Sequence, residues 1–209
     1  MMLNPAADEK NRMRKRYNHW ALAAPLHCEG ELIASPAWTV ERLLVSDNFQ
    51  IRLATVADLE VISWHRARMF QDMGELPPDL FESFRMQSRD ALRQMFEREN
   101  YFGWLAGLEN EPGRIVAGAG VQLREVPPHP QTNPIGKIDI VSGRQAIIQN
   151  VFTEPEWRRR GLAALLIERI IDWTRRNGID SVVLHASDEG RALYERLGFI
   201  ATTEMRFSR

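Results

Sequence analysis

The feature that most constrains the fold is an amphipathic segment that begins directly after a run of arginines. Residues 158–160 are all arginine, Gly161 follows, and apolar residues then recur at helical spacing to about residue 176. The expected buried stripe consists of Leu162, Leu165, Leu166, Ile170 and Trp173. Because a helix start is already electropositive, adjacent cations are unfavourable there unless an anion binds. The segment predicts an anion site at a helix start, although a solvated basic turn is an equal alternative on spacing alone.

The near-neutral charge of the whole chain means that any anion site must be local. The 209 residues carry a formal net charge of −1 at pH 7, with 44% hydrophobic and 26% charged residues. These values are ordinary for a globular protein with a substantial core, and they argue against a protein that coats nucleic acid or an anionic membrane. The longest apolar run in the second half, residues 162–167, is too short to span a bilayer.

The N-terminal part of the chain differs from the rest. Residues 1–48 show weak periodicity, and we interpret them as an N-terminal extension of uncertain role. Pro25 and His27 interrupt the apolar stretch after the basic start, so a polar extension is favoured over a signal peptide. The single cysteine, Cys28, excludes an internal disulfide and a cysteine-based metal cluster, and it fits a cytoplasmic location.

The pattern of expected elements changes at residue 49 and predicts one domain over residues 49–209. Strands are expected at 49–55, 101–109, 113–126, 144–154, 180–186 and 199–208, and helices at 55–74, 79–98, 161–176 and 187–198. Residues 127–136 contain four prolines in ten residues and are expected to form a loop. Helices interleaved among alternating strands predict an α/β (α+β) fold, with a mixed central sheet flanked by helices.

Two motifs occur in this order at a characteristic separation. Residues 158–163 read Arg-x-x-Gly-x-Ala after a strand ending in NVFTEP, and residues 192–199 read ALYERLGF. Together they resemble the GNAT superfamily of acetyl-CoA-dependent N-acetyltransferases, as a bacterial-type single-domain member, over about residues 49–207. The resemblance implies that the sheet is splayed and that the strand before the first motif carries a β-bulge. The pantetheine arm of acetyl-CoA would lie between the strands at 146–152 and 181–186.

The resemblance also implies a set of residues that bind the co-substrate acetyl-CoA. They are Val151, Phe152, Thr153, Arg158, Arg159, Arg160, Gly161, Leu162, Ala163, Ser187 and Tyr194. Main-chain N–H groups of residues 159–163 would hold the pyrophosphate, and the N–H near Val151 would support the thioester oxyanion. Ser187 stands where family members often have asparagine, and it would either contact pantetheine or cap the following helix. Gly190 would leave room for a ligand.

Two residues are candidates for proton transfer. Tyr194 matches the family position of the acid that protonates the leaving thiolate, with a packed helix tyrosine as the alternative. Glu154 is the candidate base for the acceptor amine, with a solvated loop charge as the alternative. His65, Asp72 and Glu75 lie where this family usually receives its acceptor, and His65 is expected to be a partly buried helix histidine rather than a base.

These features predict an enzyme, an acyltransferase that transfers groups other than aminoacyl groups. It would move the acetyl group of acetyl-CoA to a primary amine of a small molecule or peptide, by direct attack in a ternary complex and without a metal. Cysteine is absent from residues 49–209, which argues against a thioester intermediate. The alternative is a non-catalytic acyl-CoA-binding or regulatory module on the same fold, whereas nucleic-acid and membrane binding are not expected. The acceptor, the acyl group, a homodimer and the role of residues 1–48 are left open.

Overall fold

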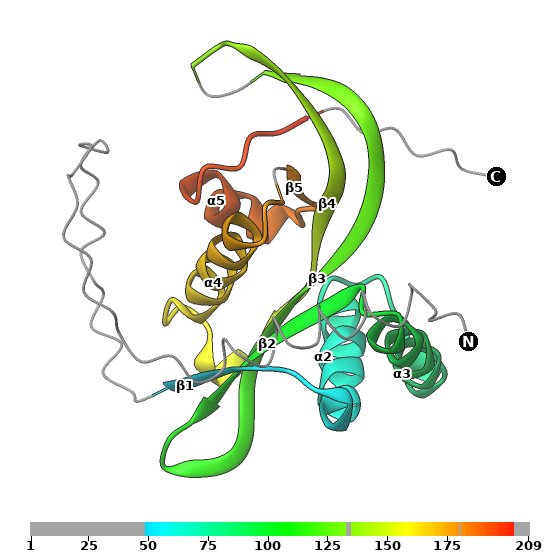
Figure 1. Ribbon diagram of the computed structural model, residues 1–209. Coiled ribbons are helices and arrows are strands. Elements are labelled where there is room, and N and C mark those ends of the chain that lie inside the picture. Colours follow the sequence, from blue (N-terminus) through cyan, green and yellow to red (C-terminus); the bar gives the residue numbers. More distant parts are fainter. Residues whose placement is uncertain (1–48, 133–134, 180, 203–209) are drawn as a thin grey trace, which may run out of the picture. The chain divides into compact units, whose positions relative to one another are not determined.

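A five-stranded sheet with its strands in chain order organises this computed structural model, which describes residues 49–132, 135–179 and 181–202 (Figure 1). The strands are β1 (Phe49–Leu53), β2 (Tyr101–Leu108), β3 (Glu111–Thr132), β4 (Ile138–Thr153) and β5 (Ser181–Leu184). The first four strands pair antiparallel with their neighbours, whereas β5 pairs parallel with β4. The described residues all belong to one of the two units of the chain, Arg42–Arg209, the other unit being Met1–Glu41.

Helices cover both faces of this mixed sheet (Figure 1). The helices α2 (Leu59–Asp72) and α3 (Phe81–Glu97) lie on one face, and α4 (Leu162–Arg176) and α5 (Asp188–Arg196) lie on the other. Short 3-10 turns, η1 (Val56–Asp58), η2 (Pro78–Leu80) and η3 (Pro155–Trp157), precede α2, α3 and α4. The predicted α/β (α+β) class with a mixed, flanked central sheet is confirmed.

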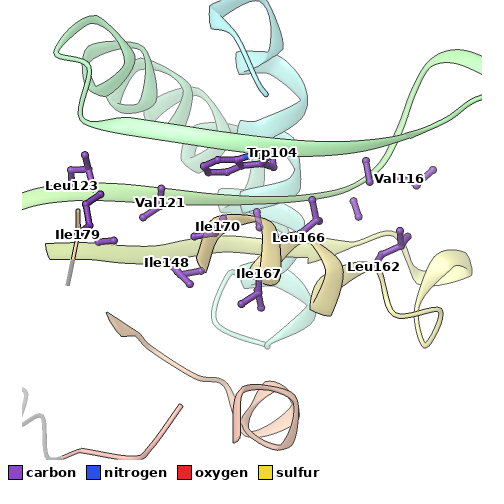
Figure 2. Packing of buried hydrophobic residues seen from close by; sticks show 14 of the residues in the cluster. Trp104, Val116, Val121, Leu123, Ile148, Leu162, Leu166, Ile167, Ile170 and Ile179 are labelled. Carbon is purple, nitrogen blue, oxygen red and sulfur yellow. The ribbon is translucent and has the colours of Figure 1, made fainter. Parts of the chain in front are cut away.

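The larger apolar cluster lies between the sheet and α4 (Figure 2). Its fully buried helix residues are Leu162, Leu166, Ile167 and Ile170, which pack with strand residues that include Trp104, Val121 and Ile148. The buried stripe differs from the predicted one, because Leu165 and Trp173 are only partly buried, whereas Ile167 and Thr174 are buried. The Thr174 hydroxyl donates to the Ile171 carbonyl at 2.8 Å, which makes its burial tolerable.

A second, smaller cluster lies between the sheet and the pair α2 and α3. It consists of Leu59, Ile62, Leu92, Tyr101 and Leu105. Tyr101 is only 2% exposed, and its hydroxyl reaches over β3 at Gly120. A β-carbon on Gly120 would lie 2.0 Å from that hydroxyl oxygen, so the position requires glycine. This packing brings α2 against the sheet at the place where β4 becomes irregular.

The proline-rich segment is a strand up to residue 132, so the predicted loop over residues 127–136 was wrong there. β3 continues through this segment and pairs with an earlier start of β4, for example His129 with Val141. β3 pairs with β2 only as far as Gln122, so in the described chain the prolines lie where one edge of β3 has no neighbouring strand. A proline, which lacks an N–H donor, is tolerated at such an edge and at the irregularity after Val126.

Other sequence predictions fall at the ends of the chain. The expected last strand, residues 199–208, is not formed at residues 199–202, and its remainder lies outside the described residues. Residues 1–48, predicted to be an extension, and residues 133–134 of the expected loop also lie outside the described residues.

The first helical segment begins with Thr55 as its N-terminal cap. The Thr55 backbone N–H donates to Asp58 Oδ2 at 2.8 Å, and the Thr55 side chain accepts from the Ala57 N–H. Arg52 donates to both Asp58 oxygens, at 2.8 and 2.6 Å. Chiefly because of the hydrogen bond from Arg52, the pKa of Asp58 falls to about 2. This carboxylate therefore ties β1 to the start of the helical segment.

Replacing Asp58 with Asn should lower the free energy of unfolding by about 1 kcal/mol at pH 7, because the cap loses its charge and one acceptor. The folded-state pKa of Asp58 is depressed. Its stabilisation is therefore fully present above about pH 4 and is lost as the pH falls toward 2. Urea denaturation of both proteins between pH 7 and pH 2.5 should show the difference shrinking. A difference independent of pH would contradict this account.

Candidate active site

β4 carries one extra residue relative to β3 near its C-terminal end. Gly120 of β3 pairs with Gln149 of β4. Two residues back along β3, Gly118 pairs with Phe152, which lies three residues further along β4. Asn150 occupies this bulge with a φ of 57°, a left-handed conformation that asparagine tolerates better than most residues. The bulge that the family resemblance implies is present.

β4 and β5 separate at the bulge. The two strands pair from Gln145 to Ile148, where Ile148 meets Leu184 at the end of β5. β4 continues to Thr153, and in the described chain no strand pairs with it on its β5 side beyond Ile148. Backbone groups of residues 149–153 that face this side therefore lack a ladder partner, and Val151, Phe152 and Thr153 lie on this edge. Such an edge suits an extended ligand with alternating amide donors and acceptors.

The turn between β4 and α4 exposes the start of that helix. Arg159 and Gly161 both have left-handed backbones, with φ values of 63° and 81°. Gly161 is the N-cap of α4, no side chain among the described residues caps the helix, and its first turn contains no acidic residue. A β-carbon on Gly161 would meet no atom within 4 Å. The N–H groups of the first turn, which includes Leu162 and Ala163, are thus accessible to a bulky anion.

The three arginines of this turn have different surroundings. Arg158 donates to the Thr153 carbonyl at 3.0 Å and forms an ion pair with Asp72 of α2. Arg160 donates to the Glu156 carbonyl at 3.3 Å, and its guanidinium lies 4.5 Å from the centroid of the Trp157 ring. The Arg159 side chain is exposed. Since Arg158 joins the turn to α2, a contact between its guanidinium and a phosphate would compete with these two partners.

Tyr194 lies on α5 as a half-buried side chain. Its ring contacts Phe199 edge-on, with centroids 6.1 Å apart, and burial raises the pKa of its hydroxyl. A β-carbon on Gly190 would lie only 2.8 Å from Cε2 of this ring. Gly190 thus leaves room for the Tyr194 ring itself, where the sequence suggested room for a ligand. The hydroxyl stays protonated at neutral pH, as an acid must before it donates.

Ser187 follows the second of its two predicted roles. It is the N-cap of α5, and its hydroxyl oxygen accepts a hydrogen bond from the Gly190 N–H at 3.2 Å. The hydroxyl can still donate one hydrogen bond to another group.

Glu154 lies on the other side of the bulge, where it faces α2. Its Oε1 lies 3.5 Å from Nε2 of His65, and its side chain is 19% exposed. Burial raises the pKa of Glu154. Burial also lowers the pKa of His65 to about 4, so this imidazole, 2% exposed, is neutral at pH 7. Glu154 is therefore a partly shielded carboxylate with a raised proton affinity, in contrast to the alternative of a solvated loop charge.

His65 is more deeply buried than the sequence predicted. Neither ring nitrogen has a hydrogen-bond partner among the described residues. Its ring centroid lies 5.0 Å from that of Phe152 in β4, and it borders a small pocket together with Tyr101 and Asn150. Of the other acidic candidates near the acceptor region, Asp72 pairs with Arg158 and with Arg68. Glu75 is exposed beyond the end of α2.

A polar network that no sequence pattern predicts lies behind the bulge. Arg66 of α2 donates from Nη1 to Asn150 Oδ1 at 2.5 Å, and Asn150 Nδ2 donates to the Tyr101 hydroxyl at 3.0 Å. Asn150 is 4% exposed, and burial raises the pKa of Tyr101 to about 12. These residues are 84 and 49 positions from Asn150 in the sequence, so no local pattern relates them. Both the oxygen and the nitrogen of the Asn150 carboxamide are thus hydrogen-bonded, which holds Asn150 in its left-handed conformation.

The fold and the site place the chain among acyltransferases, and comparison with known proteins identifies its family. The family model described as "Acetyltransferase (GNAT) family" matches residues 61–199, which is more than half of the chain. The chain therefore belongs to the GNAT acetyltransferase family and is an acyltransferase enzyme. No curated protein matches the chain.

Solved structures agree with this assignment. The chain is similar to a GCN5-related N-acetyltransferase from Ralstonia eutropha, with 30% identity, 78% of this chain and 99% of that chain covered, and a TM-score of 0.67. A predicted acetyltransferase from Clostridium acetobutylicum, solved with acetyl-CoA, has 24% identity, coverage of 78% and 96%, and a TM-score of 0.62. An aminoglycoside N-acetyltransferase solved with CoA has 19% identity, coverage of 78% and 95%, and a TM-score of 0.54. The last two likenesses show the shared fold.

In the part of the chain that the structure describes, no helix has the length and apolar character needed to cross a membrane. Within the same residues, no group of three or more His, Cys, Asp and Glu side chains is arranged to hold a metal ion.

Replacing Gly161 with Val should weaken acetyl-CoA binding at least about tenfold, the loss expected when one or two charge-assisted hydrogen bonds are broken. The new β-carbon would meet no protein atom, but a β-branched residue disfavours the φ of 81° and would displace the first-turn N–H groups. Calorimetric titration with acetyl-CoA measures the affinity, and urea denaturation checks that the fold persists. Gly113→Val, at another glycine with positive φ, is the matched control, and unchanged affinity in Gly161→Val would refute the anion site.

Proposed function

We propose that this enzyme transfers the acetyl group of acetyl-CoA to a primary amine by direct attack in a ternary complex. The observation that carries the proposal is the opening between β4 and β5, which begins at the bulge. The uncapped N-terminus of α4 follows directly in the chain, after the turn at the end of β4. These two features offer one site for an extended amide chain and another for a pyrophosphate.

The free edge of β4 would hold the pantetheine arm. Groups of Val151 to Thr153 that face away from β3 would pair with its two amides. The pyrophosphate would bind at the N–H groups of residues 159–163. The Arg158 N–H is left out of this set, because it already donates to the Pro155 carbonyl at 3.3 Å. Ser187 would use its remaining hydroxyl donor toward the pantetheine. The exposed guanidinium of Arg159 is the best placed of the three for a further phosphate contact.

The reaction requires a neutral amine and a protonated leaving group. The amine nitrogen attacks the thioester carbon, and the resulting oxyanion is stabilised by the main-chain N–H near Val151. Glu154 accepts the proton that the amine loses, directly or through water. The C–N bond forms, the C–S bond breaks, and Tyr194 gives its proton to the thiolate of CoA. The tyrosinate then regains a proton from solvent, and Glu154 releases to solvent the proton that it took from the amine.

A covalent acetyl-cysteine intermediate has no support in residues 49–209, because Cys28 is the only cysteine of the chain. Direct transfer therefore needs both substrates bound together, with the acceptor reaching the bulge from the α2 side, where Glu154 lies. The acceptor is a small-molecule or peptide amine, and we expect the reaction to occur in the cytoplasm. Similar folds bear the names aminoglycoside N-acetyltransferase and glucosamine-6-phosphate N-acetyltransferase, which indicates how widely acceptors vary on this fold.

Replacing Tyr194 with Phe should lower kcat on the order of 100-fold, because the leaving thiolate loses its proton donor. The KM for acetyl-CoA should change little, since the ring and its contact with Phe199 remain. Release of free CoA, followed with a thiol reagent and a panel of amines, measures both constants. Phe199→Leu serves as the packing control. An unchanged kcat in Tyr194→Phe would remove Tyr194 as the acid.

The activity of the unmodified enzyme should fall at acidic pH as Glu154 becomes protonated. Burial raises the pKa of Glu154, so this fall should begin at a higher pH than for an exposed carboxyl. Glu156 and Asp72 raise the pKa further, Arg68 and Arg158 oppose them, and the neighbouring His65 is neutral. Glu154→Gln should lower kcat and abolish this fall in activity at acidic pH. If the mutant keeps the fall, the base is another group.

A further inference from the structure

Arg66 is a half-buried cation for which the described residues supply no counter-ion. Among the described residues, no carboxylate lies within the 4.0 Å that defines an ion pair with its guanidinium. Its neighbours on α2 and α3 differ, because Arg68 pairs with Asp72, and Arg85 with Glu60. A partly desolvated charge without a partner is costly, so such groups usually serve a purpose beyond stability. Burial lowers the pKa of Arg66, yet an arginine remains charged at neutral pH.

The surroundings of Arg66 form a partial aromatic enclosure. The guanidinium carbon lies 5.0 Å from the centroid of Phe70 on α2 and 5.8 Å from that of Phe84 on α3. Contacts with aromatic faces hold the planar group in place but leave its edges free to donate. The hydrogen bond to Asn150 accounts for one of the five N–H donors that a guanidinium carries. Within the described chain, no other acceptor for the Arg66 guanidinium is found.

The position of Arg66 relates it to the reacting atoms. It contacts Asn150, and the next residue is Val151, whose N–H is assigned to the thioester oxyanion. Glu154, the proposed base, contacts His65, the residue before Arg66 on α2. One turn of α2 therefore lies next to both the oxyanion donor and the base. An anionic group of the acceptor bound at Arg66 would hold the acceptor beside the thioester.

We propose that Arg66 binds the carboxylate of the acceptor, and that the acceptor is an α-amino acid. This inference rests on the proposed acetyl transfer and names its substrate class. In an α-amino acid a single carbon separates the amine from the carboxylate, so a guanidinium that grips the carboxylate brings the amine to the bulge. The planar fork of arginine matches a carboxylate with two parallel hydrogen bonds. The transfer itself is unchanged: the α-amine nitrogen attacks, CoA leaves, and the product is an N-acetyl amino acid.

The test compares acids with their amides in matched enzymes. The acceptors are the common L-amino acids and the corresponding α-amides, which keep the amine and side chain but lack the negative charge. The enzymes are the unmodified protein, Arg66→Gln, Arg66→Lys and, as an exposed-arginine control, Arg93→Gln. The readout is kcat/KM from CoA release. We expect the unmodified enzyme to have a higher kcat/KM for acids than for amides. In Arg66→Gln, kcat/KM for acids should fall at least about tenfold.

The same comparison separates ligand binding from support of the bulge. If Arg66 acts only through Asn150, Arg66→Gln should lower kcat/KM for acids and for amides by the same factor. That outcome would overturn the proposal. Tyr101→Phe calibrates this effect, because it removes the other hydrogen bond of Asn150 and leaves Arg66 in place. We expect Tyr101→Phe to lower kcat/KM for both classes of acceptor by the same factor. Arg66→Lys keeps the charge but loses the fork, so it should retain part of the preference for acids.

Failure of this inference can be told from failure of the proposed function. Acetyl-CoA binding is measured by calorimetry, and polyamines, aminoglycosides and peptides are tested as acceptors without an α-carboxylate beside the amine. If acetyl-CoA binds and only these amines are acetylated, the transfer stands and the role of Arg66 is wrong. If acetyl-CoA does not bind, the proposed function itself fails. Denaturation midpoints identify any variant that has lost its fold, and Arg66→Lys then replaces Arg66→Gln in the comparison.

Discussion

The extra residue that places Asn150 in β4 is the constraint on which the rest of the site depends. It offsets the pairing with β3 and places one residue in a left-handed conformation. Beyond the last pair with β5, the main chain of β4 is left without a partner on that side in the described chain. The conformation is held by buried hydrogen bonds from Arg66 and to Tyr101, so relaxing it would strand buried polar groups. A sheet irregularity thus becomes a stable free edge, at which we propose that the ligand binds.

The run of arginines acquires a physical explanation from the same geometry. A helix start repels cations, yet three of them precede α4. Arg158 is directed to Asp72 and the Thr153 carbonyl, and it fixes the turn against α2. Arg160 lies over Trp157. The first-turn N–H groups beside Gly161 stay accessible, and the remaining positive field favours a phosphate there. Two of the three arginines therefore have structural contacts, and we propose that the ligand-binding role falls to Arg159.

The sequence allowed prediction of the elements whose signals are local. The helix after Gly161, the alternating strands and the paired motifs led to the fold, the family and the position of the bulge. Predictions were wrong or incomplete where distant residues decide the outcome. The prolines of residues 127–132 enter a strand because this segment pairs with β4, while no strand of the described residues pairs with its other edge. The contact from Arg66 to Asn150 joins residues 84 positions apart, and a single sequence gives no signal for it.

We propose that the opening at the bulge and the start of α4 form one acyl-CoA site. The sharpest test is to record amide chemical shifts of isotope-labelled protein as acetyl-CoA is added. We expect the largest changes at residues 151–153 and 159–163, whereas amides in the middle of α3 should change little. Large changes confined to α2 and α3, or none at saturating acetyl-CoA, would contradict it.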